Sequence, residues 1–163
     1  LVAPAGEHAH PAAETCERWS EAGLSSVRER LASLDTTAMI AVADDRVLLE
    51  YGDTARVSYI ASVRKSVLSM LFGVFKAEGL VDLDATLADL GIDDHQRLSD
   101  AEKQASVRDL LMARSGVYHP AANPGDNLDD APPRGSQRPG DYFLYSNWDF
   151  NALGSIFRLQ TGQ

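Results

Sequence analysis

The chain has 163 residues, which is the size of one domain, and 44% of them are hydrophobic, enough to build a core. Asp and Glu total 24 against 15 Lys and Arg, and the net charge of −9 argues against binding to nucleic acid, whose phosphates require clustered basic residues. The longest apolar run, residues 67–75, is too short to cross a bilayer, so no membrane span is expected. The one cysteine, Cys16, can form no internal disulfide.

Residues 1–14 are rich in Ala, Pro and His and have no periodicity, which predicts a flexible N-terminal arm. His8 and His10, together with Glu7, raise the alternative of a metal site. No further ligand cluster follows at a usable spacing, so a polar tail is favoured and no metal is expected. Residues 15–163 are predicted to form the folded part of the chain.

A helix followed by a β-hairpin is predicted next. Apolar residues recur at i, i+4 and i+7 over residues 24–34 and predict a helix that Ser25 or Ser26 caps. Residues 38–43 and 46–51 are apolar runs typical of strands, and the Asp-Asp pair between them is a turn signal. The two strands are therefore expected to form an antiparallel hairpin.

The strongest helix signal follows a short extended segment at residues 57–60. Residues 62–78 are apolar around nearly the whole circumference of a helix, which predicts a buried helix. Gly79 is expected to end it, since glycine is favoured just after a helix. Residues 80–94 alternate apolar side chains with Asp and predict an ordered surface connection.

Two helix-capping patterns stand in the middle of the chain. Ser99 and Glu102 have the spacing of a capping box, and Ser106 and Asp109 repeat it before an apolar run that Gly116 is expected to end. Five of the seven prolines lie in residues 119–141, which predicts a long loop.

An amphipathic helix is predicted after this loop. Its aromatic and aliphatic residues recur between residues 148 and 157, and Gly162 follows the helix. No internal repeat and no linker between domains is evident.

Ser62 and Lys65 lie at the start of the helix predicted over residues 62–78 and form the pattern S-x-x-K. Positions i and i+3 share one face of a helix, so Lys65 can reach the Ser62 hydroxyl. A serine is a weak nucleophile that needs an adjacent base, and a lysine serves as that base only when neutral, which burial favours. The alternative is structural, with Ser62 as a helix cap and Lys65 as a surface side chain.

The second pattern is Tyr145-Ser146-Asn147, where the proline-rich loop enters the last helix. A tyrosine hydroxyl can relay a proton between a nucleophile and a leaving group, and an asparagine amide can orient a substrate carbonyl. Here too a structural alternative exists, because Ser146 with Asp149 resembles a helix cap pair and Tyr145 can be a core residue.

Together these motifs resemble those of the β-lactamase-fold serine hydrolases, which include class C β-lactamases, D-alanyl-D-alanine carboxypeptidases, esterases and 6-aminohexanoate-dimer hydrolases. Residues 60–68, IASVRKSVL, resemble the first motif of the family, and Tyr145-Ser146-Asn147 resembles its Y-x-N motif. Residues 107–117 resemble the segment in which a helix of the family leads into a loop. The resemblance extends over about residues 36–160.

The resemblance implies a role for each matching residue. Ser62 would be the nucleophile that accepts the acyl group, and its backbone N–H would form half of the oxyanion hole. Lys65 would be the base and Tyr145 would assist proton transfer. Asn147 would orient the substrate, and Tyr118, on the loop after Gly116, is a further candidate for substrate binding.

One motif of the family has no counterpart. The third motif, K-T-G or a variant, belongs to a C-terminal strand. Gln160-Thr161-Gly162 resembles it in sequence, but it follows the last predicted helix directly and leaves no room for a strand. We therefore expect an α+β fold of the β-lactamase and penicillin-binding-protein type without its closing C-terminal strands. Residues 15–163 would be the N-terminal portion of one catalytic domain.

The function predicted is hydrolysis of an ester or amide, or a β-lactam-like substrate, through an acyl-enzyme on Ser62, with no cofactor. The activity of this chain alone is expected to be poor unless a complementing C-terminal segment, or another copy in a homo-oligomer, completes the fold. The alternatives are a binding module that is acylated but not deacylated, and an interaction fragment whose exposed sheet edge pairs with a partner. Because such enzymes are often exported, a periplasmic or secreted location is favoured over the cytoplasm.

Overall fold

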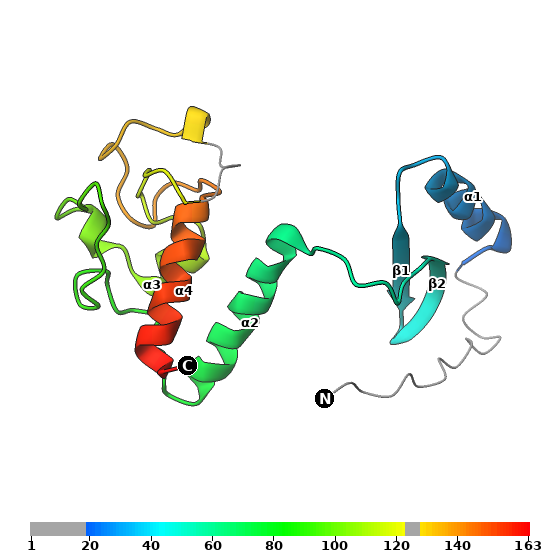
Figure 1. The fold of residues 1–163 in the computed structure, drawn as a ribbon, viewed down its shortest axis with the longest axis horizontal. Coiled ribbons are helices and arrows are strands. Elements are labelled where there is room, and N and C mark those ends of the chain that lie inside the picture. The colour runs from blue at the N-terminus through cyan, green and yellow to red at the C-terminus, as the bar shows by residue number, and fades with distance from the viewer. Residues whose placement is uncertain (1–18, 123–127) are drawn as a thin grey trace. The chain divides into compact units, whose positions relative to one another are not determined.

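A computed structural model describes residues 19–122 and 128–163, and its internal contacts divide the chain into two compact units (Figure 1). The first unit comprises residues 1–59 and the second comprises residues 60–163. The predicted N-terminal arm and its histidines lie outside the described residues.

The hairpin of the first unit matches its prediction. Strand β1, Ala38–Ala43, pairs antiparallel with β2, Arg46–Gly52, and the register shifts once within the pair. Asp44 and Asp45 have φ values of 49° and 60°, the left-handed conformation at both turn residues that a two-residue hairpin requires. Residues 57–60, expected to be extended, join neither strand.

Helix α1, Glu21–Ala32, begins three residues earlier than predicted. Its cap is Ser20, whose Oγ accepts a hydrogen bond of 3.1 Å from the backbone N–H of Gly23. The prediction of Ser25 or Ser26 as the cap was wrong, because both lie inside the helix, where the N–H groups already have partners. Ser26 instead donates its hydroxyl to a backbone carbonyl one turn earlier.

The second unit is mainly helical. Its elements in chain order are the 3-10 helices and α-helices η2 Ala61–Val63, α2 Arg64–Ala77, η3 Glu102–Gln104, α3 Val107–Leu111, η4 Leu128–Asp130 and α4 Asn147–Thr161. Helix α4 contacts both α2 and α3 (Figure 1), and it contributes three residues to the core. The buried core residues are Phe72, Val81, Leu87, Leu98, Ala105, Val107, Leu110, Val117, Trp148, Leu153 and Ile156.

Aromatic rings join α2 to α4. The ring of Phe157, on α4, lies edge-on against Phe72 and Phe75 of α2, with ring centres 5.4 Å and 5.0 Å apart. Edge-to-face pairs of this kind are more favourable than the buried area alone accounts for. This contact fixes the two helices side by side and so places their N-terminal ends in one region of the unit.

Helix α2 ends as predicted at Gly79, which adopts a left-handed φ of 76°. The N–H of Gly79 donates to Lys76 and that of Leu80 donates to Phe75, at 3.1 Å and 3.0 Å. This pair of bonds is the Schellman arrangement, which satisfies the last carbonyls of a helix and favours glycine at the left-handed position.

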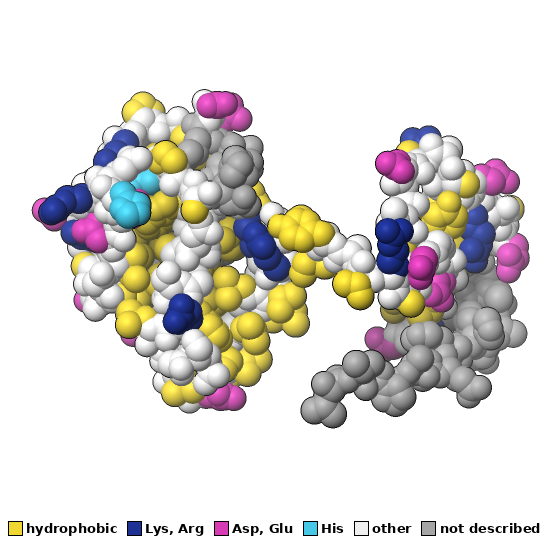
Figure 2. Space-filling model, in the orientation of Figure 1, with side chains coloured by type: hydrophobic (Ala, Val, Ile, Leu, Met, Phe, Trp, Pro, Cys, Tyr) yellow, Lys and Arg dark blue, Asp and Glu magenta, His cyan; other side chains and the backbone are white. Residues whose placement is uncertain are grey.

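The prediction that α2 is a buried helix was wrong. Only Phe72 is fully buried, whereas Val67, Met70 and Val74 expose 48%, 69% and 52% of their surface. Among the described helices of this unit α4 packs against α2, so one side of α2 is covered. Hydrophobic side chains therefore gather on the surface over α2 (Figure 2). Periodicity showed that the helix is apolar all round, but not how much of it a neighbour covers.

The connection over residues 80–94 is ordered, but it is not confined to the surface. Leu87 is fully buried and Val81 exposes 5% of its surface, so both belong to the core. The apolar residues of this alternating segment thus anchor it to the helices, while its Asp residues keep it at the surface.

Both capping patterns form, on shorter helices than expected. Ser106 and Asp109 make the predicted capping box on α3, and each accepts the backbone N–H of the other. Ser99 and Glu102 form the same reciprocal pair at the one-turn helix η3.

The prediction that Gly116 ends α3 was wrong, because the helix ends at Leu111. Gly116 lies in the following loop with a left-handed φ of 74°. A Cβ there would lie 3.1 Å from the carbonyl oxygen of Gln137, so glycine allows the two loop segments to approach closely. In the described part of residues 119–141, the predicted loop is interrupted only by η4.

We expect Phe72→Ala to lower the free energy of unfolding by about 3 kcal/mol or more, because it removes a buried ring from the contact of α2 with α4. Urea unfolding followed by circular dichroism measures the change. Met70→Ala on the same helix is the control and should change it by less than about 0.5 kcal/mol, since Met70 is 69% exposed. Equal losses in the two variants would contradict this packing.

Candidate active site

Ser62 lies at the point where the chain enters its apolar helix. It is the middle residue of η2, which runs directly into α2. The preceding Ala61 has a φ of 43°, a left-handed conformation uncommon for a residue other than glycine. Such conformations persist where the surrounding structure requires them, often at functional sites. The turn leaves Ser62 exposed, with Lys65 following in the first turn of α2.

The Y-x-N segment is built around a helix cap. Ser146 is buried, and its Oγ accepts a hydrogen bond of 3.1 Å from the N–H of Trp148, the second residue of α4. The cap thereby fixes Tyr145 just before the helix and Asn147 as its first residue. Ser146 is therefore a helix cap, as the structural alternative held, while its expected partner Asp149 accepts the hydroxyl of Ser115 at 2.6 Å. The cap does not account for Tyr145 and Asn147.

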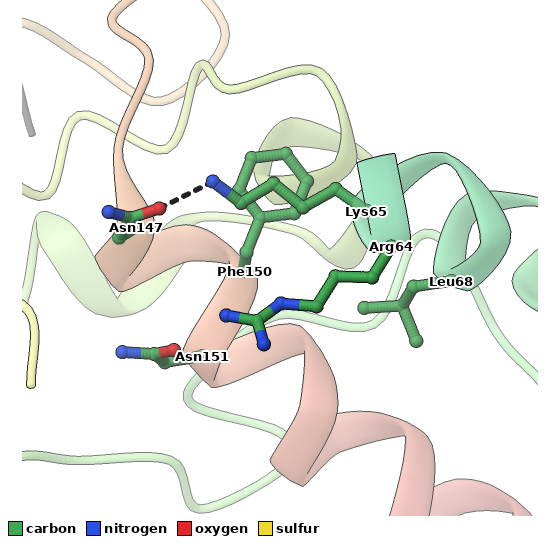
Figure 3. A pocket seen from close by; sticks show the side chains of 6 residues that line it. All are labelled: Arg64, Lys65, Leu68, Asn147, Phe150 and Asn151. Carbon is green, nitrogen blue, oxygen red and sulfur yellow. Dashed lines mark hydrogen bonds between the residues drawn. The ribbon is translucent and has the colours of Figure 1, made fainter. Parts of the chain in front are cut away.

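Four side chains from the two helix starts meet. The hydroxyl of Tyr145 donates a hydrogen bond of 2.9 Å to Oγ of Ser62, and Nζ of Lys65 lies 3.4 Å from the same oxygen. Nζ of Lys65 also donates to the hydroxyl of Tyr145 and to Oδ1 of Asn147, the second bond being drawn in Figure 3. The residues of S-x-x-K and Y-x-N, some 80 positions apart, thus form one hydrogen-bonded cluster.

The ammonium group of Lys65 also lies over two aromatic rings. Nζ is 4.1 Å from the centre of the Tyr145 ring and 4.7 Å from that of Phe150. Cations are attracted to the faces of aromatic rings, so these contacts hold the charged end of Lys65 in place. The structural alternative, in which Lys65 is a surface side chain, does not account for these contacts.

A cavity of about 300 Å³ opens beside this cluster. Figure 3 shows the side chains that line it, which come from α2 and α4. They are Arg64, Lys65, Leu68, Asn147, Phe150 and Asn151. This volume is at the lower end of the range of small-molecule sites.

Four of these lining residues were not identified as site residues from the sequence: Arg64, Leu68, Phe150 and Asn151. Phe150 and Asn151 follow Asn147 by three and four positions, which is the spacing that places residues on one face of a helix. That spacing is a usable signal once Asn147 is taken as a site residue. Arg64 carries no such signal, because its direction depends on how α2 and α4 pack.

Tyr118, predicted to bind substrate, is not among the residues that line the cavity. Its hydroxyl is buried and has no hydrogen-bond partner among the described residues. Burial raises the pKa of this phenol, and the nearby Tyr142 and Asp149 raise it further. The structure therefore brings together Ser62, Lys65, Tyr145 and Asn147, and leaves Tyr118 apart from them.

A buried polar network holds the segments that lead to the Y-x-N motif. Nδ1 of His119 lies 2.7 Å from Oδ2 of Asp94, which also accepts the indole N–H of Trp148 at 2.9 Å. Nε2 of His119 faces Oε1 of Glu102 at 3.3 Å, without the geometry of a hydrogen bond. Burial alone would raise the pKa of Asp94, but its hydrogen bonds to His119 and Trp148 hold that pKa below its ordinary value.

Glu102 joins this network to the long loop. It exposes 3% of its surface and forms a two-pronged ion pair with Arg134, at 2.9 Å and 2.8 Å. Arg134 also donates to the carbonyl of Arg97 at 2.6 Å. Burial acts to raise the pKa of Glu102, yet hydrogen bonds from Arg134 and Ser99 outweigh it and lower the pKa.

A comparison with known families identifies the class. The helices, the small antiparallel sheet and the matched residues define an α+β fold of the β-lactamase type. The model of the family described as Beta-lactamase matches residues 27–163, which is most of the chain. The chain therefore belongs to the Beta-lactamase family, a family of serine hydrolases, and the resemblance seen in the sequence is confirmed. Searches of curated proteins and of solved structures found no match.

Two further searches concern residues 19–122 and 128–163 only. Within them, no three His, Cys, Asp or Glu side chains are grouped so as to hold a metal ion. None of the helices in the same ranges combines the length and the apolar character that crossing a membrane requires.

We expect the free energy of unfolding of this chain to fall as the pH drops below about 4.5, the ordinary pKa of a glutamate. Folding lowers the pKa of Glu102, so its ion pair stabilises the folded chain only while its carboxylate is ionised. Glu102→Gln should cost roughly 2 kcal/mol at pH 7 and should reduce the pH dependence below 4.5. Urea midpoints measured from pH 7 to pH 3 give both quantities.

The control for this prediction is Asp100→Asn, which removes the same charge from an exposed residue nearby. It should leave both the stability and its pH dependence close to those of the unaltered chain. An Asp100→Asn profile that matches that of Glu102→Gln would contradict a special role for Glu102.

Proposed function

We propose that this protein hydrolyses an ester or amide of a small molecule through an acyl-enzyme on Ser62. The observation that carries the proposal is the position of Ser62 Oγ, 2.9 Å from the hydroxyl of Tyr145 and 3.4 Å from Nζ of Lys65. A serine with two proton-transfer groups in reach has the arrangement of an activated nucleophile. Membership of a serine hydrolase family supports the same reaction class.

In the first half of the reaction, Oγ of Ser62 attacks the carbonyl carbon of the substrate. Its proton passes to Nζ of Lys65, directly or through the hydroxyl of Tyr145. Because an ammonium group has no lone pair, Lys65 accepts this proton only after it has itself lost one, as the neutral amine. Backbone N–H groups at the start of α2 stabilise the negative charge that develops on the carbonyl oxygen. The bond to the leaving alcohol or amine then breaks, and Tyr145 is placed to deliver the proton that the leaving group takes.

In the second half, a water molecule attacks the acyl-Ser62 carbonyl and gives up its proton along the same route. The acid is released and the hydroxyl of Ser62 is restored, so that ester or amide plus water yields acid plus alcohol or amine. Asn147 accepts a hydrogen bond from Lys65 through Oδ1, and its side-chain amide is the group that would orient the substrate carbonyl.

A serine-reactive fluorophosphonate should add once to each chain, because only an activated hydroxyl reacts readily with it. Intact mass spectrometry detects the adduct. It should vanish in Ser62→Ala and persist in Ser66→Ala, whose serine is exposed one turn along α2. An adduct that persists in Ser62→Ala, or no adduct on the unaltered chain, overturns the proposal.

Tyr145→Phe should slow this labelling by roughly 100-fold, since it removes the hydroxyl nearest to Ser62 Oγ but keeps the ring beneath Lys65. Tyr142→Phe is the matched control and should label at the original rate. Time courses of adduct formation compare the variants. Equal rates for both would exclude Tyr145 from proton transfer.

A further inference from the structure

The buried network around His119 contains a titratable ring that the proposed reaction does not use. His119 exposes 1% of its surface and does not line the cavity beside the candidate nucleophile. Its Nδ1 lies 2.7 Å from Oδ2 of Asp94, and its Nε2 lies 3.3 Å from Oε1 of Glu102. Each nitrogen of this imidazole therefore faces a carboxyl group.

Neither carboxyl group has a hydrogen to give to the ring. Burial alone would raise the pKa values of Asp94 and Glu102, but their hydrogen bonds hold both below the ordinary values, so both groups are ionised at neutral pH. An ionised carboxylate is an acceptor only. The hydrogen between each carboxylate and the ring must therefore come from the ring nitrogen.

A neutral ring supplies only one of these hydrogens. The contact of Nδ1 with Asp94 uses it, and the lone pair of Nε2 is then left 3.3 Å from an oxygen of Glu102. Nε2 is buried and has no hydrogen-bond partner among the described residues, so nothing else compensates this contact. A proton on Nε2 replaces the repulsion of two lone pairs with the attraction of a cation for a carboxylate.

The charges of the network balance only when the ring is positive. The charged groups that face the ring, or that pair with its neighbours, come from the segment before η3, from η3 and from the long loop: Asp94, Glu102, Arg134 and the surface pair of Asp93 with Lys103. Helix α4 faces the ring with Trp148, which does not titrate. With a neutral ring, only Arg134 offsets the two carboxylates that face it, and an uncompensated charge inside a protein is costly.

We infer that His119 is an imidazolium in the folded chain, with a proton on each ring nitrogen, and that it positions the Y-x-N motif through Asp94. The oxygen of Asp94 that faces Nδ1 also accepts the indole N–H of Trp148, the second residue of α4, at 2.9 Å. The charge on His119 thus holds Asp94, and Asp94 holds the turn of α4 that begins with Asn147. Loss of the Nε2 proton as the pH rises loosens this link.

His119 is a positioning residue and takes no part in proton transfer to the substrate. Where the inference concerns the reactivity of Ser62 it rests on the proposed function, because it names a control of that same site. The charge of the ring and its link to Trp148 are measured without any reaction.

NMR of the full chain, with its histidines labelled with ¹⁵N, tests the charge directly. An imidazolium has two similar N–H groups and gives two ring-nitrogen signals close together, whereas a neutral ring gives two signals far apart. At pH 7 His119 should show the imidazolium pattern, and its absence from the spectrum of His119→Gln assigns it. A neutral pattern at pH 7 overturns the inference.

The indole N–H signals in the same samples test the link to α4. As the pH is raised until the His119 ring becomes neutral, the signal of Trp148 should shift together with that of the ring. Trp19, the other tryptophan of the chain, is the internal reference and should not follow the ring. The inference fails if the Trp148 signal does not follow the ring, or if it shifts equally in His119→Gln.

Fluorophosphonate labelling of Ser62 tests the effect on the site. At pH 7, His119→Gln should slow labelling about tenfold, since small displacements of catalytic groups by distant residues slow a reaction. Trp148→Phe should also slow it yet keep the imidazolium pattern, because it removes the N–H that reaches Asp94 and leaves the ring between its carboxylates. His95→Gln, which alters an exposed histidine, is the control and should label at the original rate.

Unchanged labelling of His119→Gln overturns the positioning role of His119. An unaltered chain that forms no adduct defeats the proposed function alone, since the NMR measurements still determine the charge of His119 and its link to Trp148.

Discussion

The contact of Phe157 with Phe72 and Phe75 is the constraint on which the candidate site depends. It holds α2 and α4 side by side, although the two helices are separated by some 70 residues of loops and short helices. Ser62 lies just before α2 and Asn147 begins α4. Because they are far apart in the sequence, only the packing of the two helices brings them close together. The site is thus a consequence of packing at the other end of the helix pair, where no reacting group is present.

A second level of organisation lies in the segments between the helices. Asp94, His119 and Glu102 come from separate parts of this region and share one buried polar network. Buried polar groups are costly unless they are paired, so such a network permits few alternative arrangements of the loops that contain it. Its hydrogen bond to Trp148 extends that restriction to the first turn of α4. Polar contacts thereby position the Y-x-N segment while apolar contacts position the helix behind it.

The sequence predicted those features that local chemistry decides. The Asp44-Asp45 turn and the end of α2 at Gly79 follow from backbone preferences of a few residues, and both are present. The exposure of α2 and the early end of α3 were mispredicted because they depend on what packs against each helix. In the same way, S-x-x-K indicated that Lys65 reaches Ser62, but only tertiary structure shows which side chains complete the cavity.

The cap made by Ser146 has a consequence for variation in this family motif. The central position of Y-x-N is nominally free, yet here its side chain holds the N–H of Trp148 and is fully enclosed. A small residue with a side-chain acceptor, such as Thr, Asp or Asn, can keep this cap, whereas Ala would lose it at a cost of about 0.5–2 kcal/mol. Saturation mutagenesis of Ser146 is therefore expected to yield few fully stable variants, although Ser146 does not line the cavity. The middle position of Y-x-N is therefore constrained, because its residue caps the start of α4 and not because it takes part in the reaction.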